Sequence, residues 1–363
     1  RGLNMASSVY IHIPFCKSIC SYCDFCKFLY NEKWVNSYLI ALKSEINDRY
    51  LDDTISTIYI GGGTPSSLTI PELRKLFDIL SIIKRSETCE FTFECNIEDI
   101  TEDLIVLLKY HGVNRLSIGI ESFQENVLKF MNRNSNFQDA LKKLDMCRNH
   151  GINNINIDLI YAVPGQTLKD LSKDLNLFLK LKPTHISTYS LIIEENTKLY
   201  IEGAKNIDEE LDYLMFKKIE KKLKHFNHYE ISNFALPNNE SLHNLTYWNN
   251  LEYYGFGLGA SGYITGIRYD NTKSLNDYLK GNIVLNKEIL SQKEKMDYEI
   301  MLGLRKLSGI NKEEFFKKYN ISIEDAYNIK PLLKNKYLVD KLGNIFIHLD
   351  KLYVMNEILI KLI

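Results

Sequence analysis

The chain has 363 residues, of which 45% are hydrophobic and 25% charged, so it is long and apolar enough to bury a large core. Its 45 basic and 46 acidic side chains give a formal charge of -1, which excludes a protein that binds nucleic acid through an overall basic surface. No apolar run approaches the roughly 20 residues of a membrane-spanning helix. The first residues also lack the apolar segment of a secretory signal. We therefore expect a cytoplasmic protein with neither a transmembrane segment nor a nucleic-acid partner.

Short β-branched and aromatic runs alternate with segments of helical apolar spacing over residues 9–191. The expected strands are Val9–Ile13, Thr57–Ile60, Glu90–Glu94, Arg115–Ile120, Asn154–Ile160 and His185–Leu191. The expected helices are Trp34–Tyr50, Ile70–Lys84, Thr101–His111, Gln124–Phe130, Phe137–His150 and Leu168–Leu181. This alternation predicts an α/β fold with a parallel sheet. Six strand-helix units are too few for an eight-stranded barrel, so we predict a partial, TIM-like (β/α)6 barrel with its site at the carboxyl ends of the strands.

The pattern changes after about residue 205. A charged helix over Glu209–Phe226 leads into an aromatic, glycine-rich loop region over Tyr229–Tyr269, which we expect to cover the barrel. From about Lys293, short helices, a hairpin candidate around Leu342–Asn344 and a last helix predict a small winged-helix-like domain. The predicted organisation is thus a barrel over 1–205, a covering segment over 206–285 and a small carboxy-terminal domain over 286–363.

Cysteines are the strongest chemical signal in the sequence. There are seven, and four of them fall between residues 16 and 26. An odd number with such crowding argues against a disulfide framework and favours metal binding. Cys89, Cys95 and Cys147 lie apart from this group and are interpreted as buried apolar residues.

The motif Cys16-x3-Cys20-x2-Cys23 directly follows the first expected strand. Three thiolates on a short loop can bind three corners of one cubane iron-sulfur cluster and leave the fourth iron open. Thiolates are soft ligands, whereas a hard cation prefers carboxylates. A structural zinc site needs a fourth ligand, and Cys26 is the candidate for this less favoured alternative.

The three-cysteine loop resembles the signature of the radical S-adenosylmethionine (SAM) superfamily. Its flanking residues, Tyr10-Ile-His-Ile-Pro-Phe-Cys16 and Tyr22-Cys23-Asp24-Phe25, resemble the branch of oxygen-independent coproporphyrinogen III oxidases and HemW haem chaperones. The resemblance implies a radical SAM barrel in which a 4Fe-4S cluster on the three cysteines chelates SAM through its open iron. It also implies reductive cleavage of SAM to a 5'-deoxyadenosyl radical, with electrons from a protein of the flavodoxin or ferredoxin type.

Further residues near the expected strand ends match the family's cofactor site. The turn Gly61-Gly62-Gly63-Thr64 exposes backbone groups to a ligand, although alone it is equally consistent with an ordinary loop. Carboxylates and a guanidinium after later strands can bind amino, hydroxyl and carboxylate groups. The resemblance implies the SAM-binding set Tyr10, Tyr22, Gly62, Gly63, Thr64, Glu94, Glu121, Arg133 and Asp158. Glu121 stands where these families typically carry Gln, so its hydrogen bonds are expected to differ.

Two features resemble the HemW branch more than the oxidase branch. Position 25 is Phe where the oxidases carry a further cysteine, and the cluster loop begins at residue 16 without their longer amino-terminal extension. The segments 229–235, His243-Asn244-x-x-Tyr247-Trp248 and 254–260 also resemble HemW. A neutral imidazole can bind haem iron, which makes His243 our haem-ligand candidate. A structural hydrogen-bonding role for His243 is the equal alternative.

The resemblance implies a chaperone that carries haem as cargo and transfers it to acceptor proteins such as respiratory enzymes. Two alternatives stay open. One is an oxygen-independent coproporphyrinogen III oxidase, which the features above disfavour; the other is a different radical SAM reaction. Whether SAM is cleaved catalytically is also open, and peripheral contact with a membrane is compatible with the sequence.

Overall fold

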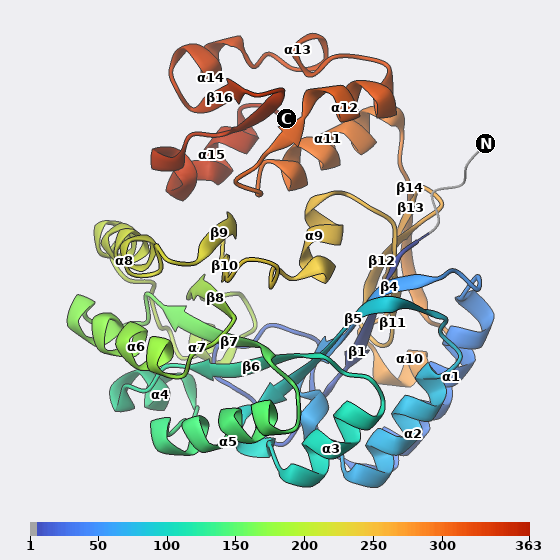
Figure 1. Cartoon of the computed structure of the whole chain (residues 1–363). Helices are drawn as coiled ribbons and strands as arrows, with labels where there is room; N and C mark the ends of the chain where they lie inside the picture. The colour runs from blue at the N-terminus through green and yellow to red at the C-terminus, as the bar shows by residue number, and fades with distance from the viewer. Residues whose placement is uncertain (1–5) are drawn as a thin grey trace.

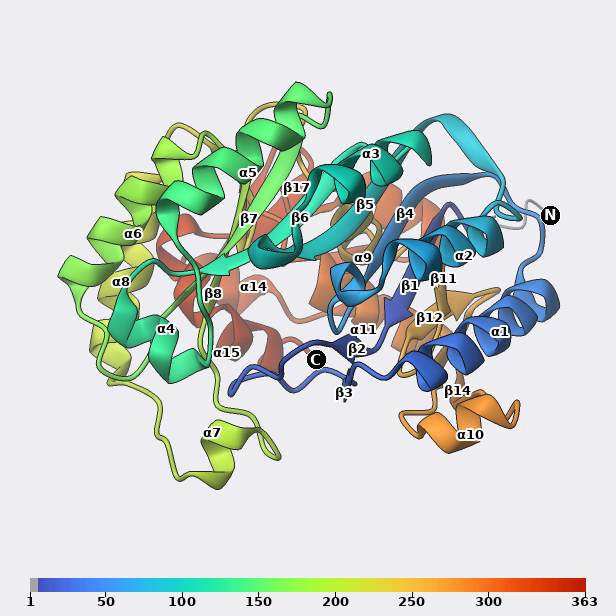
Figure 2. The same ribbon diagram turned by 90° about the horizontal axis from the view of Figure 1, so that it is seen from below.

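The computed structural model describes residues 6–363 and is built on one large curved sheet (Figure 1). The sheet has 12 strands in the order β14-β13-β12-β11-β1-β4-β5-β6-β7-β8-β10-β9. Viewed from below, helices α1 to α6 surround the outside of its central strands (Figure 2). Among the described residues, no helix is long and apolar enough to cross a membrane.

The six predicted strands are all present and pair in parallel with one another. They are β1 (Ser8–Ile13), β4 (Ile55–Gly62), β5 (Arg85–Asn96), β6 (Arg115–Glu121), β7 (Asn154–Tyr161) and β8 (His185–Ser190). The predicted helices are α1 (Glu32–Arg49), α2 (Ile70–Leu80), α3 (Glu102–Tyr110), α4 (Glu125–Met131), α5 (Phe137–Asn149) and α6 (Leu168–Lys180). The prediction of a partial (β/α)6 barrel is therefore confirmed.

Local sequence explains where several of these helices begin. The side chain of Thr101 accepts a hydrogen bond from the Leu104 amide at the start of α3, and Asn136 caps α5 in the same manner. At α6, Thr167 and Asp170 form a reciprocal capping box. These caps satisfy amide groups that a helix start leaves without partners.

The residues after 205 extend the sheet at both edges. The sequence analysis expected this region to cover the barrel and did not predict that it adds strands. Beyond β8 the chain adds β10 (Asn233–Ala235) and β9 (Asn227–Glu230) in antiparallel pairing. On the other edge, β11 (Tyr253–Phe256) pairs in parallel with β1. The antiparallel strands β12 (Ser261–Ile264), β13 (Ile267–Asn271) and β14 (Val284–Ile289) follow it. The strands within residues 229–269 were expected as loops because they are short, and glycine also interrupts β11 and β12.

The remaining elements between residues 198 and 279 are helices, and one of them packs against β4 of the barrel. They are α7 (Lys198–Ile201), α8 (Glu209–Lys222), α9 (Leu242–Trp248) and α10 (Leu275–Leu279). In Figure 1, α9 lies between the barrel and the carboxy-terminal domain. The boundary proposed at residue 285 falls inside β14, so the large sheet continues to Ile289.

The carboxy-terminal part consists of short helices around a three-stranded sheet in the order β15-β17-β16. Its elements are α11 (Gln292–Gly303), β15 (Ile310–Asn311), α12 (Lys312–Tyr319), α13 (Ile323–Ala326), α14 (Lys330–Lys334), β16 (Leu338–Lys341), β17 (Asn344–Ile347) and α15 (Met355–Ile360). The predicted hairpin is present as β16 and β17. Leu342 and Gly343 form its turn with positive φ angles of 53° and 79°, the backbone typical of a tight hairpin turn.

A buried carboxylate ties the first helix to the late strands. Glu45 of α1 is fully buried and accepts hydrogen bonds from the Gly257 amide (2.8 Å), the Tyr278 hydroxyl (2.6 Å) and Asn271 Nδ2 (2.7 Å). Arg49 Nη1 lies 2.6 Å from Glu45 Oε1 and supplies the opposite charge. Because its three neutral partners come from residues beyond 250, Glu45 fixes the added edge of the sheet to α1.

We predict that Glu45→Ala lowers the free energy of unfolding by about 3–5 kcal/mol, the usual cost of removing one member of a buried charged network. Urea denaturation followed by circular dichroism measures this change. Asp48→Ala removes an exposed carboxylate of the same helix and should cost less than about 1 kcal/mol. Equal losses in the two variants would contradict the prediction.

Candidate functional site

The loop that carries the predicted cluster ligands is held in shape by the fold. A short parallel ladder between β2 (Phe15–Cys16) and β3 (Phe28–Leu29) closes its two ends. In the middle of the loop, Ser21 Oγ donates a hydrogen bond to the Phe130 carbonyl at the end of α4 (2.8 Å). The Leu199 amide of α7 donates to the Ser21 carbonyl (3.0 Å). The loop is therefore closed at its own ends and anchored to two other parts of the chain, the end of α4 and α7.

Cys16, Cys20 and Cys23 line one cavity of about 150 Å³ at the carboxyl ends of the barrel strands, which we call the cluster pocket. Most of the expected SAM-binding residues line it too: Tyr22, Gly62, Gly63, Thr64, Glu94, Glu121, Arg133 and Asp158. Tyr10 does not. It lines a neighbouring hollow with His12 and Cys26, and its hydroxyl lies 3.0 Å from His12 Nδ1.

The donor set, three soft thiolates lining one pocket, fits an iron-sulfur cluster. Within residues 6–363, no three Cys, His or carboxylate side chains converge closely enough to hold one metal ion. A cubane does not require such convergence, because each thiolate binds a different iron atom. Cys26 lines the neighbouring hollow, with its Sγ 3.8 Å from the Lys273 carbonyl, and so does not supply a fourth thiolate to the cluster pocket.

Burial of the three thiols affects how they can take up metal. Burial raises the pKa of Cys16 to about 11, and a hydrogen bond from Thr64 Oγ1 (3.5 Å) partly offsets this effect. Burial also raises the pKa of Cys20 and of Cys23. Because iron binds the thiolate form, loading of the site at neutral pH must release protons.

The glycine-rich turn after β4 packs directly against the cluster loop. A Cβ atom on Gly63 would lie 2.9 Å from Cys16 Sγ, and one on Gly62 would lie 2.7 Å from the His12 ring. Gly62 also has a φ of +118°, which residues with side chains rarely adopt. Its amide donates a hydrogen bond to Glu94 Oε2 (3.0 Å). This turn is therefore a cradle that only glycine can form beside the cluster ligands.

Glu94 is a buried carboxyl group on the wall of the cluster pocket. Its Oε1 accepts a hydrogen bond from the Tyr59 hydroxyl (2.7 Å). Burial raises its pKa to about 7; the negative charge of Asp158 adds to the rise, and the bonds from Tyr59 and Gly62 oppose it. A cationic ligand in the pocket would favour the ionised form of Glu94. The site is thus suited to an amino group.

Arg133 and Glu121 form a buried ion pair, with Nη2 2.9 Å from Oε2. Arg133 also donates to Asn96 Oδ1 (2.9 Å) and to the Gly119 carbonyl (2.8 Å), and only its Nε is buried without a partner. The Tyr22 hydroxyl donates to Glu121 Oε1 (3.1 Å). Glu at position 121 therefore adds a full charge that Gln would not provide, and it leaves Arg133 few donors for a ligand carboxylate.

The sequence-based analysis missed several polar residues of this site, among them Asn96, Tyr59 and Arg115. A signal for them exists in the sequence. Strand β6 reads Arg-Leu-Ser-Ile-Gly-Ile-Glu, and its three alternate apolar residues are fully buried in the core. Strict alternation places Arg115 and Glu121 on the opposite, inner face.

His243 of α9 lies away from the cluster pocket. It is 1% exposed, its Nδ1 lies 2.8 Å from Thr57 Oγ1 near the start of β4, and its Nε2 lies 2.7 Å from the Tyr247 hydroxyl. Its ring stacks on Tyr59 at a centroid distance of 5.1 Å. Burial, helped by the charge of Arg115, lowers its pKa to about 3. Both ring nitrogens are hydrogen-bonded, so this geometry favours the structural alternative over haem ligation.

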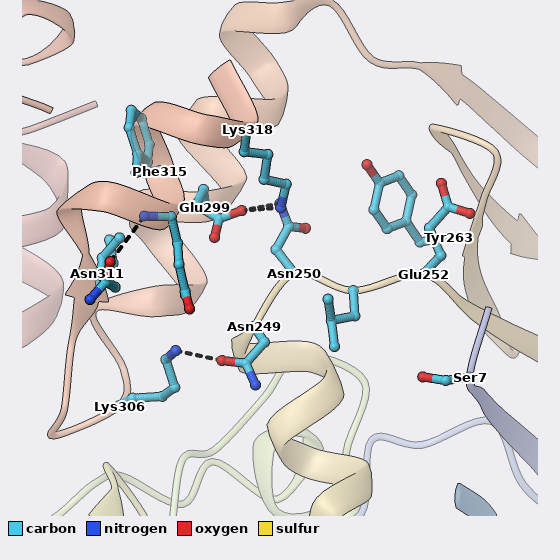
Figure 3. Close-up of a pocket in the computed structure, with 13 residues that line it drawn as sticks. Ser7, Asn249, Asn250, Glu252, Tyr263, Glu299, Lys306, Asn311, Phe315 and Lys318 are labelled. Carbon is cyan, nitrogen blue, oxygen red and sulfur yellow. Dashed lines mark hydrogen bonds and ion pairs between the residues drawn. The ribbon is translucent and has the colours of Figure 1, made fainter. Parts of the chain in front are cut away.

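Another cavity lies between the barrel and the carboxy-terminal domain (Figure 3). It measures about 660 Å³. Its polar side chains pair with one another: Lys318 Nζ lies 2.5 Å from Glu299 Oε2, and Lys306 Nζ lies 2.5 Å from Asn249 Oδ1 (Figure 3). The contact between Lys306 and Asn249 joins the two parts of the protein, whereas Lys318 and Glu299 both belong to the carboxy-terminal part.

Comparison with known proteins identifies the family to which this chain belongs. The model of the radical SAM superfamily matches residues 10–178. The HemW haem chaperone of Lactococcus lactis is 39% identical over 93% of this chain and 92% of its own length. Those of Bacillus subtilis and Escherichia coli are 38% and 31% identical, covering 88% and 90% of this chain and 89% of their own lengths. The chain belongs to the HemW family.

A solved structure supports the fold over nearly the whole chain. Coproporphyrinogen III oxidase (HemN) from Escherichia coli superimposes with a TM-score of 0.88 at 21% identity, covering 99% of this chain and 90% of that one. The radical SAM fold implied by the cysteine loop is therefore confirmed, as is the resemblance to HemW.

We predict that Glu94 makes the stability of the metal-free protein fall as the pH rises from about 4.5 to about 7. Its folded pKa of about 7 lies above the ordinary value of 4.5, so the folded state holds a proton that the unfolded state has released. This contribution is complete below the ordinary pKa and is lost as the pH rises through 7. Urea denaturation at several pH values measures the slope.

In Glu94→Gln, the unfolding free energy should depend less steeply on pH, because the amide keeps hydrogen-bonding atoms but does not titrate. Glu98→Gln, which removes an exposed carboxyl group close by, should retain the parental slope. A Glu94→Gln slope equal to that of the parent would show that Glu94 does not titrate in this range.

Proposed function

We propose that this protein is a haem chaperone that holds a 4Fe-4S cluster and SAM in the cluster pocket and passes haem to acceptor proteins. The observation that carries the proposal is the 39% identity to a haem chaperone over 93% of the chain. The gathering of three cysteines, the glycine cradle and buried carboxylates in one pocket supports it. We expect the protein to act in the cytoplasm, with respiratory enzymes among its acceptors and a flavodoxin- or ferredoxin-type protein as its reductant.

Residues of the cluster pocket have distinct parts in this proposal. When bound, the cluster supplies an open iron for SAM and an electron for its reduction. Cys16, Cys20 and Cys23 hold three irons in place. Glu94 receives the amino group of the methionyl part, and Asp158, which is oriented by Asn156 Nδ2 at 2.8 Å, receives a ribose hydroxyl.

An apolar rim beside the cluster pocket supports haem as the cargo. Phe25 is 65% exposed and Ile192 is 61% exposed, and both line the cavities at the carboxyl ends of the strands. Large apolar side chains on a concave surface mark a binding site for an apolar partner. A flat, largely apolar porphyrin matches this rim. Phe25 also occupies the position at which the oxidase branch carries a cysteine.

We predict that anaerobic reconstitution with iron and sulfide gives a cluster in the parent but not in Cys16→Ala, because the loss of one thiolate leaves two ligands for the cubane. Iron and sulfide analysis with visible absorbance measures the loading. Cys26→Ala is the matched control from the same loop and should load as the parent does. Loss of metal in Cys26→Ala would instead favour a site with four thiolates.

We predict that the reconstituted parent binds haem saturably and that His243→Ala still does so, with a free energy of unfolding lower by about 1–3 kcal/mol for each buried partner left unsatisfied. Absorbance titration measures haem binding, and urea denaturation measures stability. His225→Ala, an exposed control, should change neither property.

The same titration separates the competing interpretations. Loss of haem binding by a folded His243→Ala would identify His243 as the ligand after all. A parent that loads a cluster but does not bind haem saturably would contradict the chaperone function. Formation of protoporphyrinogen from coproporphyrinogen III under anaerobic, reducing conditions with SAM would establish the oxidase alternative.

A further inference from the structure

A second cavity lies inside the barrel and shares a wall with the cluster pocket. It measures about 350 Å³, and Glu94, Glu121 and Asp158 line both spaces. Polar residues of the parallel strands form another part of its wall: Tyr59, Arg115, Ser117, Asn156, Ser187 and Tyr189. Asn244 of α9 also lines this space, which we call the barrel cavity.

Arg115 is the exceptional residue of the barrel cavity. It is 2% exposed, and its Nε is buried without a hydrogen-bond partner. In the described part of the chain, no carboxylate lies within ion-pair distance of its guanidinium, and its Nε has no hydrogen-bond acceptor. Arginine is rarely this buried unless it is paired, because removing its charge from water is unfavourable.

The carboxylates that line the barrel cavity do not neutralise Arg115 by contact. Glu121 is paired with Arg133, and both oxygens of Glu94 accept hydrogen bonds from Tyr59 and Gly62. Burial also raises the pKa of Glu94 to about 7, which reduces its negative charge near neutral pH. Arg115 thus faces the barrel cavity with at least one N–H group that has no partner in the protein.

We propose that the barrel cavity binds a carboxylate-bearing ligand and that Arg115 recognises the carboxylate. A guanidinium presents two parallel N–H groups that match the two oxygens of a carboxylate. The hydroxyl groups of Ser187 and Tyr189 can donate further hydrogen bonds, and Ile160 and Leu191 offer apolar contacts to a carbon chain.

The negative charge of the cavity wall favours a carboxylate over a phosphate as the bound anion. Glu94, Glu121 and Asp158 all line the barrel cavity, and their charges repel a dianionic phosphate more strongly than a singly charged carboxylate. A carboxylate of this kind is present both in small free acids and in the propionate side chains of a porphyrin. The inference concerns the carboxylate itself and stands without the proposed chaperone function.

The first arm of the test measures thermal stability with propionate and with propionamide, at an ionic strength matched by potassium chloride. Propionate should raise the Tm of the parent, whereas propionamide, which has a similar shape and no charge, should not. Arg115→Gln should abolish the rise in Tm with propionate. Arg115→Lys should weaken it, since lysine keeps the charge but lacks the two parallel N–H groups of the guanidinium. Arg85→Gln, which changes an arginine outside the barrel cavity, should respond as the parent does.

Circular dichroism shows whether each variant folds. If Arg115→Gln does not fold, Arg115→Lys carries the test, and a Lys variant that responds fully to propionate overturns the proposal. A parent with no Arg115-dependent response to propionate or to haem also overturns it, and Arg115 is then only a counter-charge for the buried carboxylates.

The second arm identifies the source of the carboxylate by titrating the reconstituted protein with haem and with haem dimethyl ester. If a porphyrin propionate reaches Arg115, the parent should bind the ester on the order of tenfold more weakly than it binds haem. Arg115→Gln should bind haem and the ester with the same low affinity. The site is assigned to a free acid if the parent binds haem and the ester with equal affinity and propionate still raises its Tm. Absence of haem binding with an intact propionate response would overturn the chaperone function alone.

Discussion

The ion pair between Arg133 and Glu121 is the contact through which the cluster loop, the sheet and the segment after α4 are held together. Arg133 follows α4, yet its guanidinium reaches β5 through Asn96 and β6 through Gly119 and Glu121. Its Nη1 also lies 3.8 Å from Cys20 Sγ. Tyr22, from the cluster loop, completes the network on the other oxygen of Glu121. Because such a network is favourable only when its members are satisfied together, the position of Cys20 depends on β5, β6 and α4 at once.

Burial governs the electrostatics of the whole inner face. It raises the pKa of Glu94, Asp158 and the cluster thiols, and it lowers the pKa of His243 and His185. All of these shifts favour neutral forms in the protein without bound ligands. Cationic and metal ligands reverse the preference, since they stabilise carboxylate and thiolate. The cluster pocket is therefore suited to gain its charges together with its ligands.

The local parts of this structure could be predicted from the sequence, because they depend on neighbours along the chain. The six parallel strands follow from short β-branched runs, and the cluster loop follows from the spacing of Cys16, Cys20 and Cys23. The hairpin turn at Leu342 and Gly343 is equally local.

The rest depends on contacts between distant residues, which no local pattern encodes. The three neutral partners of Glu45 lie more than 200 positions away, near β11, which pairs with β1. The family resemblance placed Tyr10 in the SAM-binding set, but its hydroxyl lies beside His12 in the neighbouring hollow and not in the cluster pocket. The family motif around His243 could be recognised from the sequence. Whether its imidazole is available to bind haem iron depends on a contact with Thr57, far earlier in the chain.

The two ends of the barrel have different roles, and this difference limits how ligands can reach the inside. At the amino-terminal end, α9 is fixed by hydrogen bonds from the Leu242 and His243 amides to Glu90 and from His243 to Thr57. Ligands of the barrel cavity must therefore approach from the carboxyl ends of the strands, past Phe25 and the cluster loop. A ligand there and one in the cluster pocket would share the walls formed by Glu94, Glu121 and Asp158. Since each changes the charge felt by the same carboxylates, the binding free energies of the two ligands are coupled, and the coupling acts equally in both directions.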